Sequence, residues 1–262
     1  MTVPLWTRPR HHPTGARVSI RLLAFAETLL TDEIRFVMDR YGAPSPGPVR
    51  ELQVGQTAWE DDPPWFDNWR IDAMKVIARM QLPDADRLDA ARHCYSVVAD
   101  VEDRPDHAHL QAAWAVARWL VDRGCFAVLD PDAARWHDGA RVAALASDRP
   151  FDLDAEIGLI IETTPRKEFG RGHALHTRGM VKFARPDVMV AATPDNANRL
   201  MEVVRRVAQW MADGEMPSAG QGLDVNDDHE FFFVPLEPGI NAPQVNLNND
   251  AVLLVPASTL TG

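Results

Sequence analysis

Apolar residues recur along the chain with two periods, that of a strand and that of a helix. Alternating or continuous apolar runs predict strands, and they lie at residues 18–22, 49–54, 74–82, 94–101, 156–163, 175–183, 187–192, 230–234 and 251–255. The near-continuous run at 94–101 is rich in β-branched residues, which is typical of a central strand buried on both faces. Residues 184–186 would form the turn of a hairpin.

Two longer segments have apolar residues at helical spacing. One covers about residues 106–122 and the other about 195–212, and in both the apolar side chains fall at offsets 0, 3, 4, 7, 10 and 11 from Leu110 or Leu200. Each stripe would pack one face of an amphipathic helix on a sheet. Because the two stripes share their spacing, we expect both helices on one face of a single sheet, or on equivalent faces of two similar halves.

Turn residues assign three further segments. A helix is expected after the first strand as far as Tyr41, because the Gly- and Pro-rich residues 42–48 would end it. Residues 59–69 are rich in aromatic residues, acids and prolines, which predicts a loop lying on the body of the protein. Residues 84–92 are predicted to form a short helix.

These elements indicate an α+β fold, a two-layer sandwich of helices and sheet. Two ferredoxin-like halves in one compact body are the architecture that we expect. The corresponding division is an N-terminal extension at 1–17, a first α/β half at 18–102 and a second α/β half at 103–262. A single domain is the alternative.

Composition excludes two classes of partner. The chain has 27 Lys and Arg residues against 38 Asp and Glu residues, a formal net charge of −11, whereas a general nucleic-acid binder needs a net basic face. No apolar stretch approaches the roughly 20 residues that span a bilayer. The apolar run at 22–26, flanked by Arg21 and Glu27, is too short for a signal peptide. We therefore expect a cytoplasmic protein with neither a nucleic-acid nor a membrane partner.

Neither a metal nor a cofactor is expected. Cys94 and Cys125 each open an apolar run and show no metal or redox spacing, which is typical of buried, reduced thiols. His107 and His109 form a His-x-His pair at a predicted helix start, but no three ligands share a recognisable spacing. The run at 224–230 resembles the opening of a calcium loop and lacks the glycine at its sixth position.

A cationic segment, residues 165–187, contrasts with the acidic remainder of the chain. It holds six lysines and arginines against Glu168 and Asp187. Because arginine forks bind carboxylate and phosphate groups bidentately, the segment predicts a small anion site. The candidate residues are Arg171, His173, His176, Arg178 and Lys182. Two alternatives stay open, in which the charges pair with neighbouring acids on a solvated hairpin, or Arg178 is buried against a carboxylate.

Residues 177–190, Thr-Arg-Gly-Met-Val-Lys-Phe-Ala-Arg-Pro-Asp-Val-Met-Val, resemble the signature of a bacterial domain family of unknown function. The family pattern is Thr-x-Gly-Leu/Met-x-x-Phe-Gly-x-Pro-Glu/Asp-Leu-x-Val followed by a helix, and Ala184 replaces its usual glycine. The resemblance covers about residues 94–215. It implies a hairpin held by Gly179 and Pro186, with Asp187 at the strand entry, and it brings no established activity.

Two functional hypotheses follow from these residues. The first is a non-catalytic binding or interaction module, whose small cationic site and Trp-rich segment around Trp59, Trp65 and Trp69 take a small anion or a protein partner. The second is a hydrolase or transferase that uses His173 or His176 as acid–base and Arg178 to hold an anionic substrate. We favour the first. A histidine in a cleft with an orienting partner would favour the second. The sequence leaves the oligomeric state open.

Overall fold

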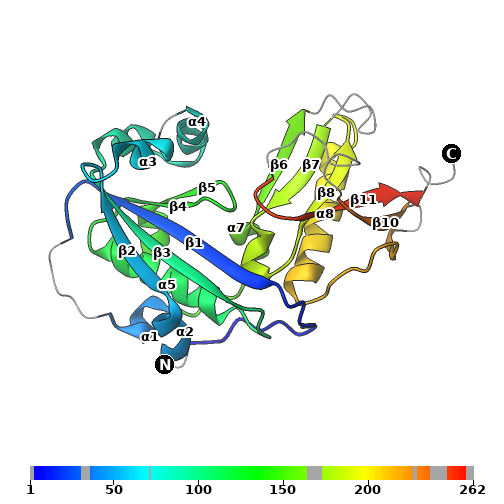
Figure 1. Cartoon of the computed structure of the whole chain (residues 1–262), viewed down its shortest axis with the longest axis horizontal. Coiled ribbons are helices and arrows are strands. Elements are labelled where there is room, and N and C mark those ends of the chain that lie inside the picture. The colour runs from blue at the N-terminus through cyan, green and yellow to red at the C-terminus, as the bar shows by residue number, and fades with distance from the viewer. Residues whose placement is uncertain are drawn as a thin grey trace. The chain divides into compact units, whose positions relative to one another are not determined.

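The computed structural model of the chain describes residues 3–30, 36–70, 72–163, 173–226, 229–236 and 247–257 (Figure 1). The chain divides into two compact units. Unit 1 comprises Met1–Thr7, Arg17–Glu102 and Asp106–Phe151, and unit 2 comprises Arg8–Ala16, Asp103–Pro105 and Asp152–Gly262. The expected boundary at residue 103 does not coincide with this division, because residues 106–151 supply two helices to unit 1 and the two strands that complete its sheet.

Unit 1 is built on a five-stranded antiparallel sheet. Its strands are β1 (Arg17–Ala26), β2 (Gln53–Ala58), β3 (His93–Glu102), β4 (Ala127–Asp130) and β5 (Arg135–Asp138), in the order β2-β3-β1-β4-β5. The central strands β1 and β3 pair over their whole length. Both were predicted from their apolar runs.

Helices lie against both faces of this sheet. They are α1 (Met38–Tyr41), α2 (Pro46–Glu51), α3 (Pro63–Asn68), α4 (Asp72–Gln81), the 3-10 helix η1 (Ala85–Ala90), α5 (Ala108–Asp122) and α6 (Gly139–Ala143). The long helix α5 packs along β1 and β3. On the other face Leu23 and Phe25 of β1 share a core with α3 and η1, in which the ring of Phe25 meets that of Phe66 edge-on at 5.7 Å.

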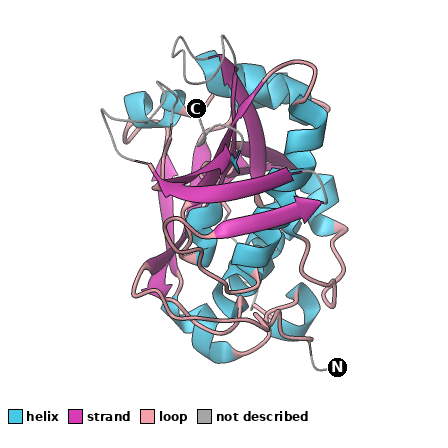
Figure 2. Cartoon of the chain, turned by 90° about the vertical axis from the view of Figure 1, so that its right-hand side faces the viewer, coloured by secondary structure: helices cyan, strands magenta, loops and turns pink. Residues whose placement is uncertain are grey.

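Unit 2 holds a six-stranded sheet of different topology. Its strands are β6 (Gly158–Thr163), β7 (His173–Arg178), β8 (Asp187–Ala192), β9 (Gly222–Asn226), β10 (His229–Pro235) and β11 (Ala251–Pro256), in the order β6-β7-β8-β11-β10-β9. β8 and β11 run parallel, and the other described pairs run antiparallel. The helices are α7 (Leu153–Glu156), the 3-10 helix η3 (Met180–Phe183) and α8 (Ala197–Ala212). Figure 2 shows strands and helices in a second orientation.

The α+β class is confirmed, and so are the two long helices. α5 packs on the sheet of unit 1, and α8 packs on β7 and β8 of unit 2. The two sheets differ in strand order and in the presence of a parallel pair. Two related ferredoxin-like halves are therefore not confirmed. Among the described residues, no helix combines the length and the apolar character that crossing a membrane requires.

Three local predictions in unit 1 are wrong. Residues 74–82, expected as a strand, lie mostly in α4, where Ala78 is buried while Val76 and Met80 are exposed. Residues 49–54 were expected as a strand, but residues 49–51 lie in α2 and only 53–54 lie in β2. Proline favours the first turn of a helix, and α2 begins at Pro46. Residues 59–69 contain α3, whose N-cap Asp62 accepts a hydrogen bond from the amide of Trp65 at 3.1 Å.

The strand predicted at 175–183 is also too long. β7 ends at Arg178 because Gly179 adopts a φ of 101°, which turns the chain into η3. Of the helix expected before Tyr41, the described residues contain α1 alone, a single turn. Residues 31–35 lie outside the described residues.

Candidate functional site

The described part of the cationic segment, residues 173–187, folds as β7, η3 and the start of β8, so most of its described charges lie inside unit 2. Lys182 and Glu156 are both fully buried, and the Lys182 Nζ lies 3.6 Å from Oε2 of Glu156 and donates to its backbone oxygen. The positive charge of a buried ammonium group is balanced by the carboxylate beside it. Lys182, predicted for an anion site, therefore has an acidic partner from α7. Arg171 lies outside the described residues.

His176 is fully buried in β7. Its Nδ1 lies 2.9 Å from the backbone oxygen of Thr177, and its Nε2 lies 3.5 Å from Oε1 of Glu162. Because a carbonyl oxygen can only accept, Nδ1 is the protonated nitrogen and donates to the oxygen of Thr177. Both ring nitrogens therefore face protein oxygens. His173, at the other end of the strand, is half-buried.

Arg178 and Asp187 interact electrostatically between β7 and β8. Nε of Arg178 is buried and has no hydrogen-bond partner among the described residues. Asp187 is fully buried, and its Oδ1 accepts from the Thr177 hydroxyl at 2.7 Å and from the Met180 amide at 3.3 Å. Burial raises the pKa of Asp187 to about 7, although these hydrogen bonds and the charge of Arg178 act in the opposite direction.

A buried charge cluster that the sequence did not reveal holds the separate segments of unit 2 together. Asp103 pairs with Arg8 and, at 2.9 Å, with Nη1 of Arg185. Arg185 also donates to the backbone oxygens of Glu215 at 2.7 Å and His12 at 3.0 Å. Burial raises the pKa of Asp103, but the hydrogen bonds and the positive charges of Arg185 and Arg8 together bring it below its ordinary value. The arrangement is that of a structural ion network.

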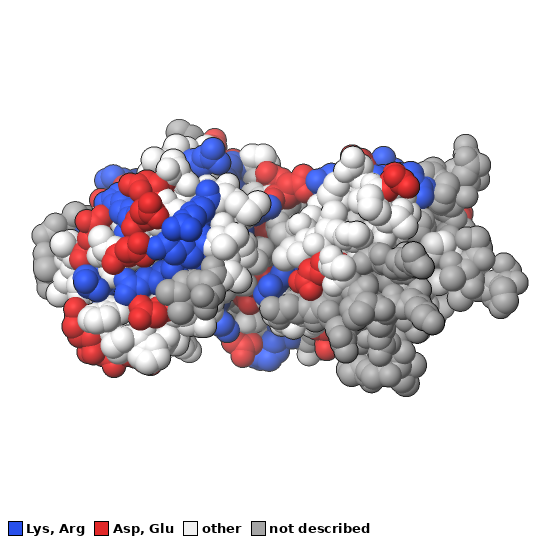
Figure 3. Space-filling view, turned by 90° about the horizontal axis from the view of Figure 1, so that it is seen from above, with Lys and Arg blue, Asp and Glu red and all other residues white. Residues whose placement is uncertain are grey.

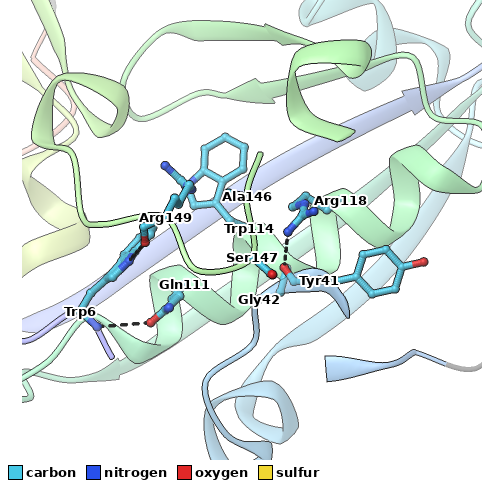
Figure 4. A pocket seen from close by; sticks show the side chains of 10 residues that line it. Trp6, Tyr41, Gly42, Gln111, Trp114, Arg118, Ala146, Ser147 and Arg149 are labelled. Atoms are coloured by element: carbon cyan, nitrogen blue, oxygen red, sulfur yellow. Dashed lines mark hydrogen bonds between the residues drawn. The ribbon is translucent and has the colours of Figure 1, made fainter. Parts of the chain in front are cut away.

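Unit 1 contains a small cleft lined by two arginines, Arg118 and Arg149, which we call the cationic cleft (Figure 4). Its lining residues are Trp6, Tyr41, Gly42, Gln111, Trp114, Ala115, Arg118, Ala146, Ser147 and Arg149. Arg118 of α5 donates from Nη1 to the backbone oxygen of Tyr41 at 3.0 Å, while its Nε is buried without a hydrogen-bond partner among the described residues. Burial lowers the pKa of Arg118, Asp122 raises it, and the positive charge of Arg149 lowers it further.

Aromatic rings form the other wall of the cationic cleft. The guanidinium of Arg149 lies 4.7 Å from the ring centroid of Trp6 and 5.8 Å from that of Trp114. Nε1 of Trp6 donates to the backbone oxygen of Arg149 at 2.9 Å, which fixes the loop after α6. The cavity volume is about 10 Å³, the space of one water molecule.

A glycine allows the close approach at the base of the cleft. Gly42 has a φ of 86°, and a Cβ built on it would lie 2.7 Å from the backbone oxygen of Ser147. Only a residue without a side chain fits both the conformation and the contact. The lining residues come from four distant parts of the chain, so sequence reasoning missed them; an arginine within the mostly apolar α5 was the available signal.

Several surface charges of unit 1 form ion pairs with each other. Over the part that holds α3 and α4, basic and acidic residues lie side by side (Figure 3). Nζ of Lys75 lies 2.5 Å from Asp89, and Nη2 of Arg79 lies 3.6 Å from Asp86. Such mixed surface pairs are typical of a solvated face, and they leave the cationic cleft as the stronger candidate.

Cys94 and Cys125 are buried free thiols, as predicted. Within the described part of the chain, no three His, Cys, Asp or Glu side chains form a group that could hold a metal ion. No protein family, no curated protein and no solved structure matches the chain. The function is therefore inferred from the geometry of the chain's own residues.

Proposed function

We propose that the protein is a non-catalytic binding module that takes the carboxylate or phosphate group of a small anion or of a protein partner at the cationic cleft. The observation that carries the proposal is Arg118. Its Nε is buried without a partner among the described residues, beside the like charge of Arg149. Buried donors without partners are rare in folded proteins, and a charged oxygen acceptor is the group that satisfies a guanidinium best.

The dimensions of the cleft define how such a group would bind. A volume of about 10 Å³ admits one oxygen atom, and the remainder of the ligand would stay outside. The buried rings of Trp6 and Trp114 line the cleft with apolar surface. This geometry favours recognition of a terminal acidic group over the enclosure of a whole small molecule.

The hairpin site predicted at Arg171, His173, His176, Arg178 and Lys182 stays a prediction, as does the resemblance of residues 177–190 to a bacterial domain family. Three described members support it with a buried nitrogen that has no hydrogen-bond partner among the described residues, namely Nε of Arg178, Nδ1 of His173 and Nε2 of His176. His176 and Lys182 support it less, since each faces a carboxylate of unit 2.

The alternative, acid–base catalysis by a histidine, receives less support. Nδ1 of His176 hydrogen-bonds the backbone oxygen of Thr177, and Nε2, which has no hydrogen-bond partner among the described residues, lies 3.5 Å from the Glu162 carboxylate. The ring is fully buried, so neither nitrogen is accessible to a substrate from solvent. A general base needs a nitrogen within hydrogen-bond reach of the proton that it removes.

Isothermal titration with phosphate and acetate tests the proposed anion binding. We expect binding to the natural chain and a loss of about tenfold or more in affinity in Arg118→Gln. Arg141→Gln, at an exposed arginine of α6, is the matched control and should bind like the natural chain. Equal affinities of the natural chain and Arg118→Gln, or no binding to either, would refute the proposal.

A further inference from the structure

Unit 2 contains a cavity of about 240 Å³ between α8 and β9. Val203, Arg206, Val207 and Trp210 line it from one stripe of the helix, at helical spacings of three and four residues. Leu223 and Asp224 line it from the strand. Four apolar side chains, one cation and one anion thus line the space, which is open to solvent on one side.

The arrangement of α8 explains why this cavity exists. The helix packs on β7 and β8, whereas β9 lies at the edge of the sheet, beyond β11 and β10. The helix therefore leaves space next to the edge strand. The ring of Trp210 stacks on Phe233 with centroids 6.1 Å apart, and it forms a rigid apolar wall on the inner side.

The two charged side chains of the cavity are exposed and oppose each other in sign. Neither Arg206 nor Asp224 has a side-chain hydrogen bond or an ion pair with another of the described residues. The neighbouring Arg205, in contrast, binds Asp154 at 2.7 Å. Arg206 and Asp224 are thus free to bind a ligand that carries both charges.

We propose that this cavity binds a free α-amino acid with a large apolar side chain. The side chain enters the space between Val203, Val207 and Trp210, the carboxylate binds Arg206, and the ammonium group binds Asp224. Pockets for drug-sized ligands are about 300–1,000 Å³, so a cavity of 240 Å³ is suited to a ligand with one ring or one branched chain. The amino-acid site is independent of the cationic cleft, which lies in the other unit.

Titration calorimetry with L-phenylalanine, L-tryptophan and L-leucine tests the proposal. We expect at least one to bind, and expect phenethylamine and 3-phenylpropionate, which each lack one charge, to bind about tenfold more weakly than L-phenylalanine. In Arg206→Gln the affinity for L-phenylalanine should fall to that for phenethylamine. In Asp224→Asn it should fall to that for 3-phenylpropionate.

Two control variants establish that the amino acid binds in this cavity and not elsewhere on the protein. Arg199→Gln, at an exposed arginine of α8 outside the cavity, should leave binding unchanged, and so should Arg118→Gln in unit 1. The absence of binding by all three amino acids at about 10 mM would overturn the proposal. N-acetyl-L-phenylalanine amide, which carries neither charge, would also overturn it by binding as tightly as L-phenylalanine, because the cavity would then recognise a side chain within a peptide.

Discussion

The carboxylate of Asp187 accepts a hydrogen bond of 2.7 Å from the hydroxyl of Thr177, in the buried interior of unit 2. The same hydroxyl accepts from the amide of Val188 at 2.9 Å, so one side chain connects β7 to the start of β8. Thr177 and Asp187 are the first and the last polar residues of the motif at 177–190. A buried carboxyl at this point makes the stability of unit 2 depend on pH.

Asp187 should make the protein less stable as the pH rises from about 4 to 7. Its pKa is about 7 in the folded chain and 3.8 as an ordinary value, so between these values the folded state keeps a proton that the unfolded state has lost. Stability then falls by up to about 4 kcal/mol across this window and is constant above it. Urea unfolding at several pH values measures the slope.

Asp187→Asn is the matched variant for this prediction. It keeps the acceptor for Thr177 and Met180 but does not titrate, so the fall between pH 4 and 7 should be smaller than in the natural chain. The prediction fails if both proteins lose stability equally over that window.

Breaking the buried pair of Lys182 and Glu156 should destabilise unit 2 strongly. In Lys182→Met the carboxylate of Glu156 is left in the interior without its counter-charge, which costs about 3–5 kcal/mol. Arg205→Gln, which removes the exposed partner of Asp154, should cost less than about 1 kcal/mol. Similar losses in both variants, measured by urea unfolding, would contradict a structural role for Lys182.

Ala184→Gly should stabilise the protein by about 0.5–1 kcal/mol. Ala184 has a φ of 53°, a left-handed conformation that glycine adopts without strain and alanine does not. It is also the position at which the resembling family carries glycine. Ala192→Gly, at a buried alanine of β8, is the control and should destabilise instead, because a strand glycine adds chain entropy to the unfolded state. A loss of stability in Ala184→Gly, measured by urea unfolding, would show that the backbone of Ala184 is not strained.

The long elements could be predicted because each shows its own period. The stripes from Leu110 and Leu200 and the apolar run at 94–101 correspond to α5, α8 and β3. Short segments such as 74–82 could not, since a few apolar residues fit a strand and a helix equally well. This segment forms the helix α4, and its packing against β5 and η1 involves residues outside the segment itself.

The candidate sites were less predictable than the fold, because partners distant in sequence determine burial. Lys182 belongs to a cationic segment, and a carboxylate 26 residues earlier neutralises it. Arg185 is neutralised by Asp103, 82 residues away. Local charge density therefore predicted an exposed cationic site where the chain forms buried ion pairs. The cationic cleft has no local signature for the same reason, since Trp6 and Arg149 are 143 residues apart.

Gly42→Ala should damage the cationic cleft and the stability of unit 1 together. A methyl group at this position would lie 2.7 Å from the backbone oxygen of Ser147, and alanine would be strained at a φ of 86°. The loop that carries Arg149 must then move away from α5, so we expect a loss of about 1–3 kcal/mol and weaker anion binding. Gly47→Ala is the matched control, because its φ is not left-handed and a Cβ there meets no atom within 4 Å apart from those of its two chain neighbours and the backbone of its own helix. Urea unfolding and phosphate titration of both variants check the prediction. If Gly42→Ala unfolds and binds like Gly47→Ala, the approach of Gly42 to Ser147 does not shape the cleft, and the anion site would have to be sought elsewhere in the chain.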